Sequence, residues 1–490
     1  MRQRFVLCIL LGWPLGSVAA HPRPGNPLTL AVRRAAETIL VTDLRRWVGY
    51  LASDVLLGRK TPLPGADSAV AYLRRNLPRT RLRPGGSNGE WFQRIPVVVR
   101  RLDPSRSFLE LNGERLPFAE YARLAAGPPP RDTTITAPLV FAGIHVHGSI
   151  VVITTDSTLP PSGRRHVFHR GARAILSTPS RVQVEQWNSE ANLHETLWEY
   201  SATERAWPFR PVLIGSPALF TKLLAGDQLP LKRALTIHLA GSTDSTSAAN
   251  LLAFVPGRDS LLRNEYVIVG AHYDGQGITA PVAGDSILNS ADDNASGSAA
   301  LLAIARAFAI GPRPRRSVLF AWWAGQEGHR LGSGHFIRNP VVPTANQVAY
   351  VNLDMVGRTT RLSDSRAGRR PCAREVWPPQ GKSEPAAQYG PDELDVAGSS
   401  RLLDSISRSV NAGYLCMQWN YRTAGGPSDE LDPSVPVLLF EEHNPDAHGL
   451  GDTADKIDYQ KLGRVAKSVY AVVWEIANST ERPKQDKPRP

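Results

Sequence analysis

From Asn250 to near the C-terminus, the sequence alternates short apolar runs with longer segments of helical periodicity. The helical patterns lie at about 295–309, 399–412 and 460–476. The apolar runs are "NLLAFVPG", "EYVIVGAHYD", "SVLFAWWA", "QVAYVNLDMVG" and "VPVLLFEE". Strands that alternate with helices form largely parallel sheets with helices on both faces. The sequence therefore predicts an α/β domain over residues 246–478, with a mostly parallel central sheet.

The rest of the chain follows other patterns. Residues 21–108 contain two helical patterns, at 42–57 and 66–77, which predict a helical lead-in to the α/β domain. Residues 109–245 consist of short β-rich runs separated by Pro and Gly, which predict an inserted module. Residues 479–490 are charged and rich in Pro, so we expect a disordered tail.

The first twenty residues have the layout of a secretory signal. Arg2 and Arg4 precede the apolar run 5–15, and small residues follow at 18–20. We therefore expect residues 1–20 to be a signal peptide and the mature protein to be periplasmic or extracellular. No later stretch reaches the roughly 18 apolar residues of a membrane helix, so stable membrane insertion is not expected. In an oxidising compartment Cys372 and Cys416 could form a disulfide, but the sequence does not show that they meet.

A net charge of +12 raises the question of a nucleic-acid partner. The arginines are scattered along the chain, as at Arg45, Arg74 and Arg313, and they form no basic helix with interleaved aromatic residues. We therefore expect a solvated basic surface and no binding of nucleic acid. The oligomeric state cannot be read from the sequence.

Residues with metal-binding side chains follow the predicted strands or open the helix behind them. The five candidate ligands are His272, Asp293, Glu327, Asp354 and His448. Ligands bind at the carboxyl ends of the strands in such sheets, so these side chains are expected to lie together. An Asp at a helix start is usually a cap, and a single His after a strand is usually only hydrogen-bonded. Recurrence at successive strand ends is much harder to explain in that way.

Two imidazoles and three carboxylates are the ligands that a pair of Zn²⁺ ions requires when one carboxylate bridges them. Nitrogen and oxygen ligands without thiolates fit a catalytic zinc site better than a structural one. Asp274 lies two residues after His272 and so on the same side of the chain. It is therefore placed to accept the second ring N–H of His272 and to orient that ligand.

Six ordered motifs give the chain a family resemblance. They are "GAHYDGQG", "NSADDNASGSAA", "GQEGHRLGS", "NLDMVGR", "GGPSDELDPSVPVLLF" and "HNPDAHGLGDTADKIDY". In these motifs the chain resembles the di-zinc peptidases that include bacterial leucyl aminopeptidases and glutamate carboxypeptidases, the zinc exopeptidases of clan MH. The segment "YLASDVLLGRKTPLPG" resembles the lead-in of secreted members, and the insert with "GARAILS" resembles a protease-associated module.

The resemblance implies a role for each candidate residue. His272, Glu327, Asp354 and His448 would be ligands of two zinc ions, with Asp293 as the bridging carboxylate. Asp293 is preferred to its neighbour Asp292 because the family's bridging residue stands immediately before the residue that opens "NASG". The implied activity is hydrolysis of peptides close to a free N-terminus.

The position of the general base departs from the family pattern. The segment normally reads Glu-Glu, with the first residue as general base and the second as ligand, whereas here Gln326 precedes Glu327. An amide cannot accept the proton, so a contribution of roughly 10²- to 10⁴-fold would be lost. His329 and Glu430, which also depart from the family pattern, are candidate substitute acceptors, although drift at the rim of a weakened site explains them equally well.

Two functions follow from this pattern. The first is an exported zinc aminopeptidase with impaired activity, and the alternative is a catalytically inactive, metal-binding homologue that binds peptides. A glutaminyl-cyclase-like transferase on the same fold is less favoured, because those relatives bind one zinc ion and this chain keeps all five ligands.

Overall fold

The structure is a computed structural model. It describes residues 28–78, 80–126, 132–141, 146–153, 166–179, 184, 197–201, 210–224, 233–328, 330–359, 372–375, 390–423 and 431–486. The expected signal peptide, His329 and Glu430 lie outside these residues. Within them, no helix combines the length and the apolar character needed to cross a membrane.

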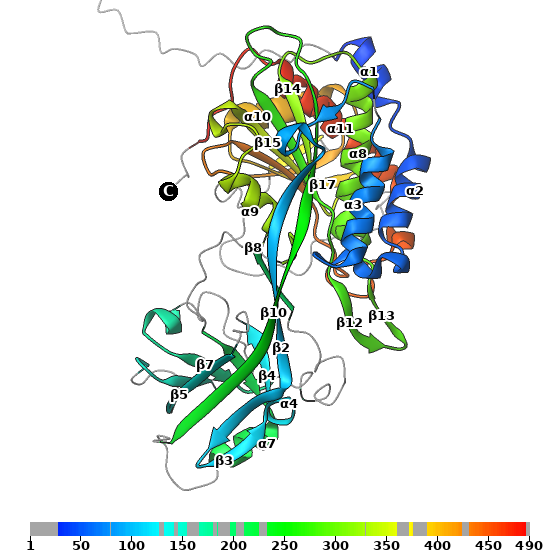
Figure 1. The fold of residues 1–490 in the computed structure, drawn as a ribbon. Coiled ribbons are helices and arrows are strands. Elements are labelled where there is room, and N and C mark those ends of the chain that lie inside the picture. Colours follow the sequence, from blue (N-terminus) through cyan, green and yellow to red (C-terminus); the bar gives the residue numbers. More distant parts are fainter. Residues whose placement is uncertain are drawn as a thin grey trace, which may run out of the picture.

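The α/β domain is built on one large mixed sheet (Figure 1). Its strands, in spatial order, are β1 (Arg83–Pro84), β10 (Ala234–Val255), β14 (Ser317–Trp323), β11 (Tyr266–His272), β15 (Gln347–Asp354), β19 (Val437–Glu441), β17 (Glu393–Gly398), β18 (Gln418–Thr423) and β16 (Ala373–Glu375). The four central strands β14, β11, β15 and β19 are mutually parallel, while β10 and β17 pair with them antiparallel. The prediction of an α/β fold with a mostly parallel central sheet is confirmed.

Both faces of this sheet are covered. One face packs against α8 (Gly297–Ile310) and α11 (Tyr459–Asn478), whose inward side chains belong to the largest apolar core. The other face packs against α9 (Leu331–Arg338) and nearby loop residues. All residues of β14 are buried, as expected of a strand with helices on both sides. Helix α10 (Arg401–Gly413) packs beside α11 at the edge of the first face.

The lead-in consists of α1 (Leu30–Ala36), α2 (Val41–Leu51), a short 3₁₀ segment η1 (Asp54–Arg59) and α3 (Pro64–Asn76). The helix expected over 42–57 is therefore too long, because α2 ends at Leu51. The reason lies in η1, where Leu57, Gly58 and Arg59 all have left-handed backbones with φ of 47°, 69° and 52°. Apolar periodicity alone cannot reveal such a turn.

A long antiparallel ribbon of β2 (Phe92–Leu111) and β10 joins the α/β domain to the inserted module (Figure 1). The boundaries expected at 108/109 and 245/246 fall inside these two strands. The module's sheet continues from the ribbon and includes β3 (Glu114–Pro117), β4 (Ala122–Ala126), β5 (Asp132–Phe141), β6 (Ile150–Ile153), β7 (Ala174–Ser177) and β9 (Val212–Gly215). Helices α4 (Phe118–Tyr121) and α7 (Pro217–Leu224) complete a separate apolar core. β8 (Leu197–Ser201) pairs with β2.

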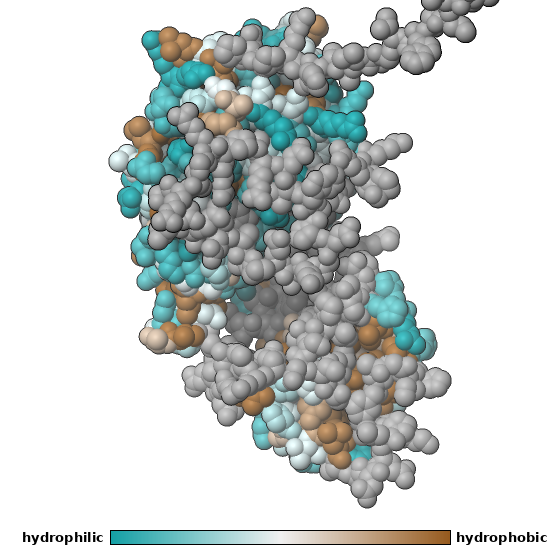
Figure 2. Space-filling view, turned by 180° about the vertical axis from the view of Figure 1, so that it is seen from behind, coloured by the Kyte–Doolittle hydropathy of each residue, from teal (hydrophilic) through white to brown (hydrophobic). Residues whose placement is uncertain are grey.

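The surface view separates the two parts of the molecule. Figure 2 shows mostly hydrophilic residues with scattered hydrophobic ones over the α/β domain, and it shows hydrophobic residues also on the inserted module. The hairpin β12 (Gly277–Val282) and β13 (Asp285–Leu288) projects from the α/β domain toward the module (Figure 1).

The end of the described chain is ordered by contacts with the α/β domain. Residues 479–490 were expected to be disordered, but Arg482 donates hydrogen bonds to the carbonyls of Ala345 and Gln347, and the N–H of Asp486 donates to Ser399. In the structure residues 479–486 therefore lie against the α/β domain, held by hydrogen bonds to carbonyls next to β15 and β17. Cys372 and Cys416 form a disulfide.

Candidate metal centre

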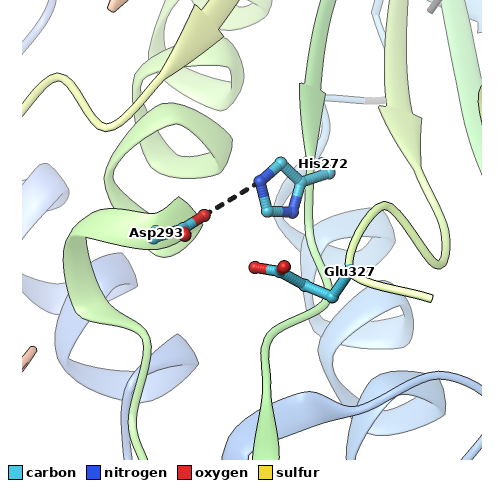
Figure 3. Close-up of side chains that lie close together, drawn as sticks. All are labelled: His272, Asp293 and Glu327. Carbon is cyan, nitrogen blue, oxygen red and sulfur yellow. Dashed lines mark ion pairs between the residues drawn. The ribbon is translucent and has the colours of Figure 1, made fainter. Parts of the chain in front are cut away.

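The candidate ligands lie at the carboxyl edge of the parallel strands. His272 is the last residue of β11 and Asp354 the last of β15, while Glu327 and His448 follow β14 and β19. Asp293 lies in the short helical turn that precedes α8. Figure 3 shows His272, Asp293 and Glu327 pointing toward one another from three different segments. Parallel strands end at the same edge, which is why residues distant in sequence meet here.

A single carboxylate, that of Asp293, connects the two imidazoles. Its Oδ1 lies 3.1 Å from His272 Nε2, and its Oδ2 lies 2.9 Å from His448 Nε2. His272 Nε2 is also 3.4 Å from Asp354 Oδ1. His448 Nε2 is 3.6 Å from Glu327 Oε2. The five predicted ligands thus form two groups that share Asp293 through different oxygens.

These distances fit metal coordination. Two atoms bound to one tetrahedral zinc ion at about 2.0–2.1 Å lie about 3.3 Å apart, and the four contacts above lie around that value. Suitable atoms of His272, Asp293 and Glu327 all lie within 4.8 Å of one another. Glu327 Oε1 is buried and accepts no hydrogen bond from the described residues. A buried acceptor without a donor is costly, and a bound cation would satisfy it.

The charge balance of the cluster also favours a cation. Burial and the neighbouring Asp293 carboxylate raise the pKa of Glu327 to about 8. Burial likewise raises the pKa of Asp354. For Asp293 burial would raise the pKa, but hydrogen bonds with His272 and His448 hold it well below its ordinary value. The carboxylates therefore repel one another without a metal, and a divalent ion would relieve this repulsion.

Asp274 connects two ligand-bearing segments. It is buried, and its Oδ1 lies 3.5 Å from His272 Nδ1. The same carboxylate accepts hydrogen bonds from the backbone N–H of Gln326 at 3.0 Å and of Glu327 at 3.2 Å. It lies where it can hold the His272 ring and the Glu327 segment in a fixed relation.

Asp292 and Asp293, although adjacent, face different partners. Asp292 is fully buried and accepts hydrogen bonds from the Gly357 N–H at 2.8 Å and from Asn444 Nδ2 at 2.7 Å. Burial and the nearby carboxylate of Asp452 raise the pKa of Asp292 to about 7. Asp292 thus ties together the loops after β15 and β19, while Asp293 faces the imidazoles.

Comparisons with known proteins agree with this geometry. Residues 250–473 match the family model for peptidase family M28. This domain belongs to peptidase family M28. The M28 domain contains all five candidate ligands and the elements that carry them.

Curated relatives share part of the chain. A probable zinc metalloprotease of Pyrenophora teres f. teres is 25% identical over 235 residues, which cover 45% of this chain and 47% of the relative. A probable leucine aminopeptidase of Arthroderma otae is 27% identical over 241 residues, which cover 46% of this chain and 57% of the relative. The match thus spans about half the length of these curated relatives.

Among solved structures, an aminopeptidase from Aneurinibacillus sp. strain AM-1 has a similar fold. The TM-score is 0.56 at 19% sequence identity, with 94% of this chain and 98% of that chain covered. The likeness therefore extends beyond the M28 domain to the lead-in and the insert. At this identity it is evidence for the fold alone.

Of the other residues predicted to act at this site, the structure describes only some. Gln326 lies in the turn after β14, directly before Glu327, and its N–H is bound by Asp274. The suggested substitute bases His329 and Glu430 lie outside the described residues.

Two residues near the centre have contacts that sequence reasoning did not foresee. Asp452 is buried and accepts the backbone N–H groups of Asp292 at 2.9 Å and of Asp293 at 3.0 Å. Arg59, from the lead-in, is buried behind the same segments. Both residues lie in motifs that carry the family resemblance, but their hydrogen-bond partners are backbone atoms, which every residue type has.

Proposed function

We propose that this protein is an exported, zinc-dependent peptidase of aminopeptidase type, which hydrolyses peptide bonds near a free N-terminus with two co-catalytic zinc ions. The observation that carries the proposal is the position of Asp293, which offers one oxygen to each of two ligand groups. His272 and Asp354 would complete one zinc site, and Glu327 and His448 the other. The zinc named for the curated relative supports the choice of metal.

Bound zinc would polarise the scissile carbonyl and lower the pKa of the attacking water. The residues of the chain serve to arrange this chemistry. Asp293 would hold the two ligand groups at a fixed separation. Asp274 would fix the His272 ring and the Glu327 segment through one carboxylate. Both are buried, which strengthens their electrostatic interactions.

Gln326 determines how fast this site can work. Its amide occupies the position of the general base and cannot carry a proton between the attacking water and the leaving amine. Loss of that step would lower the rate by roughly 10²- to 10⁴-fold and leave slow hydrolysis. The same residue supports the second candidate, a non-catalytic relative that binds zinc and peptide ends.

Export is supported by two features of the chain. The first twenty residues have the layout of a signal peptide. The disulfide between Cys372 and Cys416 is a bond that persists in oxidising compartments.

The test is hydrolysis of a panel of aminoacyl chromogenic substrates by the zinc-loaded mature protein. Glu327→Ala, which removes a ligand, is the control, and Gln326→Glu restores the usual base. Turnover by the wild type that Glu327→Ala abolishes would support a slow peptidase. Activity in Gln326→Glu alone would support the non-catalytic alternative. Zinc binding without activity in any variant would refute the peptidase proposal.

A further inference from the structure

The turn of η1 inserts between two segments that carry ligands. Gly58 approaches β12 so closely that an added Cβ would lie 2.2 Å from the carbonyl oxygen of Gly277. The N–H of Gly275 donates to the Arg59 carbonyl at 3.3 Å. Asn289 Nδ2 donates to Asp54 Oδ1 at 2.8 Å. The lead-in is thus packed against the chain just after His272 and just before Asp293.

The Arg59 side chain enters this junction with no exposed surface. Its Nε donates to the Tyr273 carbonyl at 3.0 Å, and Tyr273 lies between His272 and Asp274. Its Nη1 donates to the carbonyls of Asn289, at 2.8 Å, and of Leu51. Its Nη2 donates to the Ser290 carbonyl at 2.8 Å. One guanidinium therefore bonds both the end of β11 and the segment that leads into Asp293.

The charge of Arg59 is balanced at a distance. No carboxylate of the described residues lies within ion-pair distance of it, so its direct partners are neutral carbonyls. Burial lowers the pKa of Arg59 to about 10, while the carboxylates of Asp274 and Asp452 act to raise it. It remains protonated at neutral pH. A fully buried cation without an ion pair is costly, and this one lies behind the acidic cluster.

We propose that Arg59 is a positioning residue of the metal centre, which sets the spacing between the segment carrying His272 and the segment carrying Asp293. The inference rests on the zinc site proposed above. By this inference the "LLGR" turn of the lead-in helps to position the ligands of that site. Only the planar fork of arginine can donate at once to three carbonyls of the two ligand-bearing segments and to that of Leu51, so lysine cannot replace it.

The test compares zinc affinity with fold stability in matched variants. Arg59→Lys keeps the charge but loses the fork. Arg316→Lys is the control, because Arg316 is also buried and binds Glu265 at 2.6 Å, but it precedes β14 at the opposite end from the ligands. Zinc dissociation constants are measured by competition with a chromophoric chelator, and thermal unfolding is followed for the metal-free proteins. The visible absorption of the Co²⁺-loaded proteins reports coordination geometry independently.

We expect Arg59→Lys to bind zinc about 10- to 100-fold more weakly and to change the Co²⁺ spectrum, as outer-shell substitutions do. Arg316→Lys should lose thermal stability but keep the zinc affinity and the spectrum. If Arg59→Lys does not fold, Asp54→Ala serves as the second test variant. Asp54 is exposed, and its carboxylate accepts a hydrogen bond from Asn289 in the segment that leads into Asp293. The zinc affinity of this variant should fall by about 2- to 13-fold.

Wild-type zinc affinity and an unchanged spectrum in Arg59→Lys would overturn the inference, as would equal losses of affinity in the Arg59 and Arg316 variants. If Arg59→Lys does not fold, unchanged zinc affinity in Asp54→Ala would overturn it. If the wild type binds no zinc, the proposed function fails, and this inference fails with it. Zinc binding by the wild type that is unaffected by Arg59→Lys refutes the inference alone.

Discussion

Replacing Asp452 by Asn should weaken zinc binding without touching a ligand. In the wild type the buried carboxylate accepts two consecutive N–H groups, from Asp292 at 2.9 Å and Asp293 at 3.0 Å. Asparagine has the same shape but only one acceptor oxygen. Its NH₂ group would face one of the two N–H groups, so Asp293 would lose part of its support.

The magnitude follows from the contact that is lost. A hydrogen bond to a charged group contributes about 1.5–3 kcal/mol. Asp452 is 1% exposed, so water cannot replace the lost bond. If the whole loss falls on the conformation that binds zinc, the affinity decreases by about 10- to 150-fold.

The assay is zinc competition titration, with Asp458→Asn as the matched control. Asp458 also accepts two backbone N–H groups, from Gln460 at 3.1 Å and Lys461 at 3.0 Å. These belong to the start of α11, which carries no predicted ligand, and asparagine caps helices as well as aspartate does. Zinc affinity should therefore be unchanged in Asp458→Asn. Wild-type affinity in Asp452→Asn would refute the reasoning, because the amide contacts would then have no influence on the ligand.

Three further outcomes are expected. Zinc affinity should rise between about pH 7 and 9, because zinc must displace protons from two of its ligands. Burial raises the pKa of Glu327 to about 8, and the hydrogen bond with Asp293 raises the pKa of His448 to about 9. Calorimetry in buffers of different ionisation enthalpy measures this proton release, and a zinc affinity that does not depend on pH would contradict the prediction. In urea unfolding, Gly58→Ala should lower the free energy of unfolding by more than the about 1–2 kcal/mol expected for Gly89→Ala. Both glycines have left-handed backbones, but only a side chain at position 58 would meet a neighbouring backbone. Equal losses of free energy in the two variants would exclude this steric contribution. Replacing both cysteines of the disulfide, which lie 44 residues apart, should lower the free energy of unfolding by about 4 kcal/mol, and an unchanged urea midpoint would contradict that value.

The fold class could be predicted because the signal is local. Residues 317–323, for example, form a strand that is buried on both faces. Such a strand has apolar residues at consecutive positions, so it can be recognised from the sequence alone. The ribbon of β2 and β10 was not predicted. Its strands continue for 20 and 22 residues across two cores, and their burial pattern changes along the way. A sequence read in short windows divides such a strand at each change.

The candidate ligands could be predicted because the carboxyl ends of parallel strands share one edge. His272 and Asp354 each end a strand, and topology alone brings them to 3.4 Å. The residues behind them could not be predicted in the same way. Arg59 and Asp452 act on carbonyl and N–H groups of segments up to about 230 residues away, and every residue type has such groups. No pattern of side chains therefore marks the partner.

The sequence by itself determined the α/β architecture, the identity of the five candidate ligands and the substitution at Gln326, because each depends on residue type and order. Only the tertiary structure decided that Asp293 faces both imidazoles while Asp292 turns away, and that η1 of the lead-in lies behind the metal centre. These outcomes depend on backbone geometry at the turns that precede α8 and α3. The direction of a side chain in these turns is set by packing between segments that are distant in sequence. The local conformational preferences of the residues do not encode such packing.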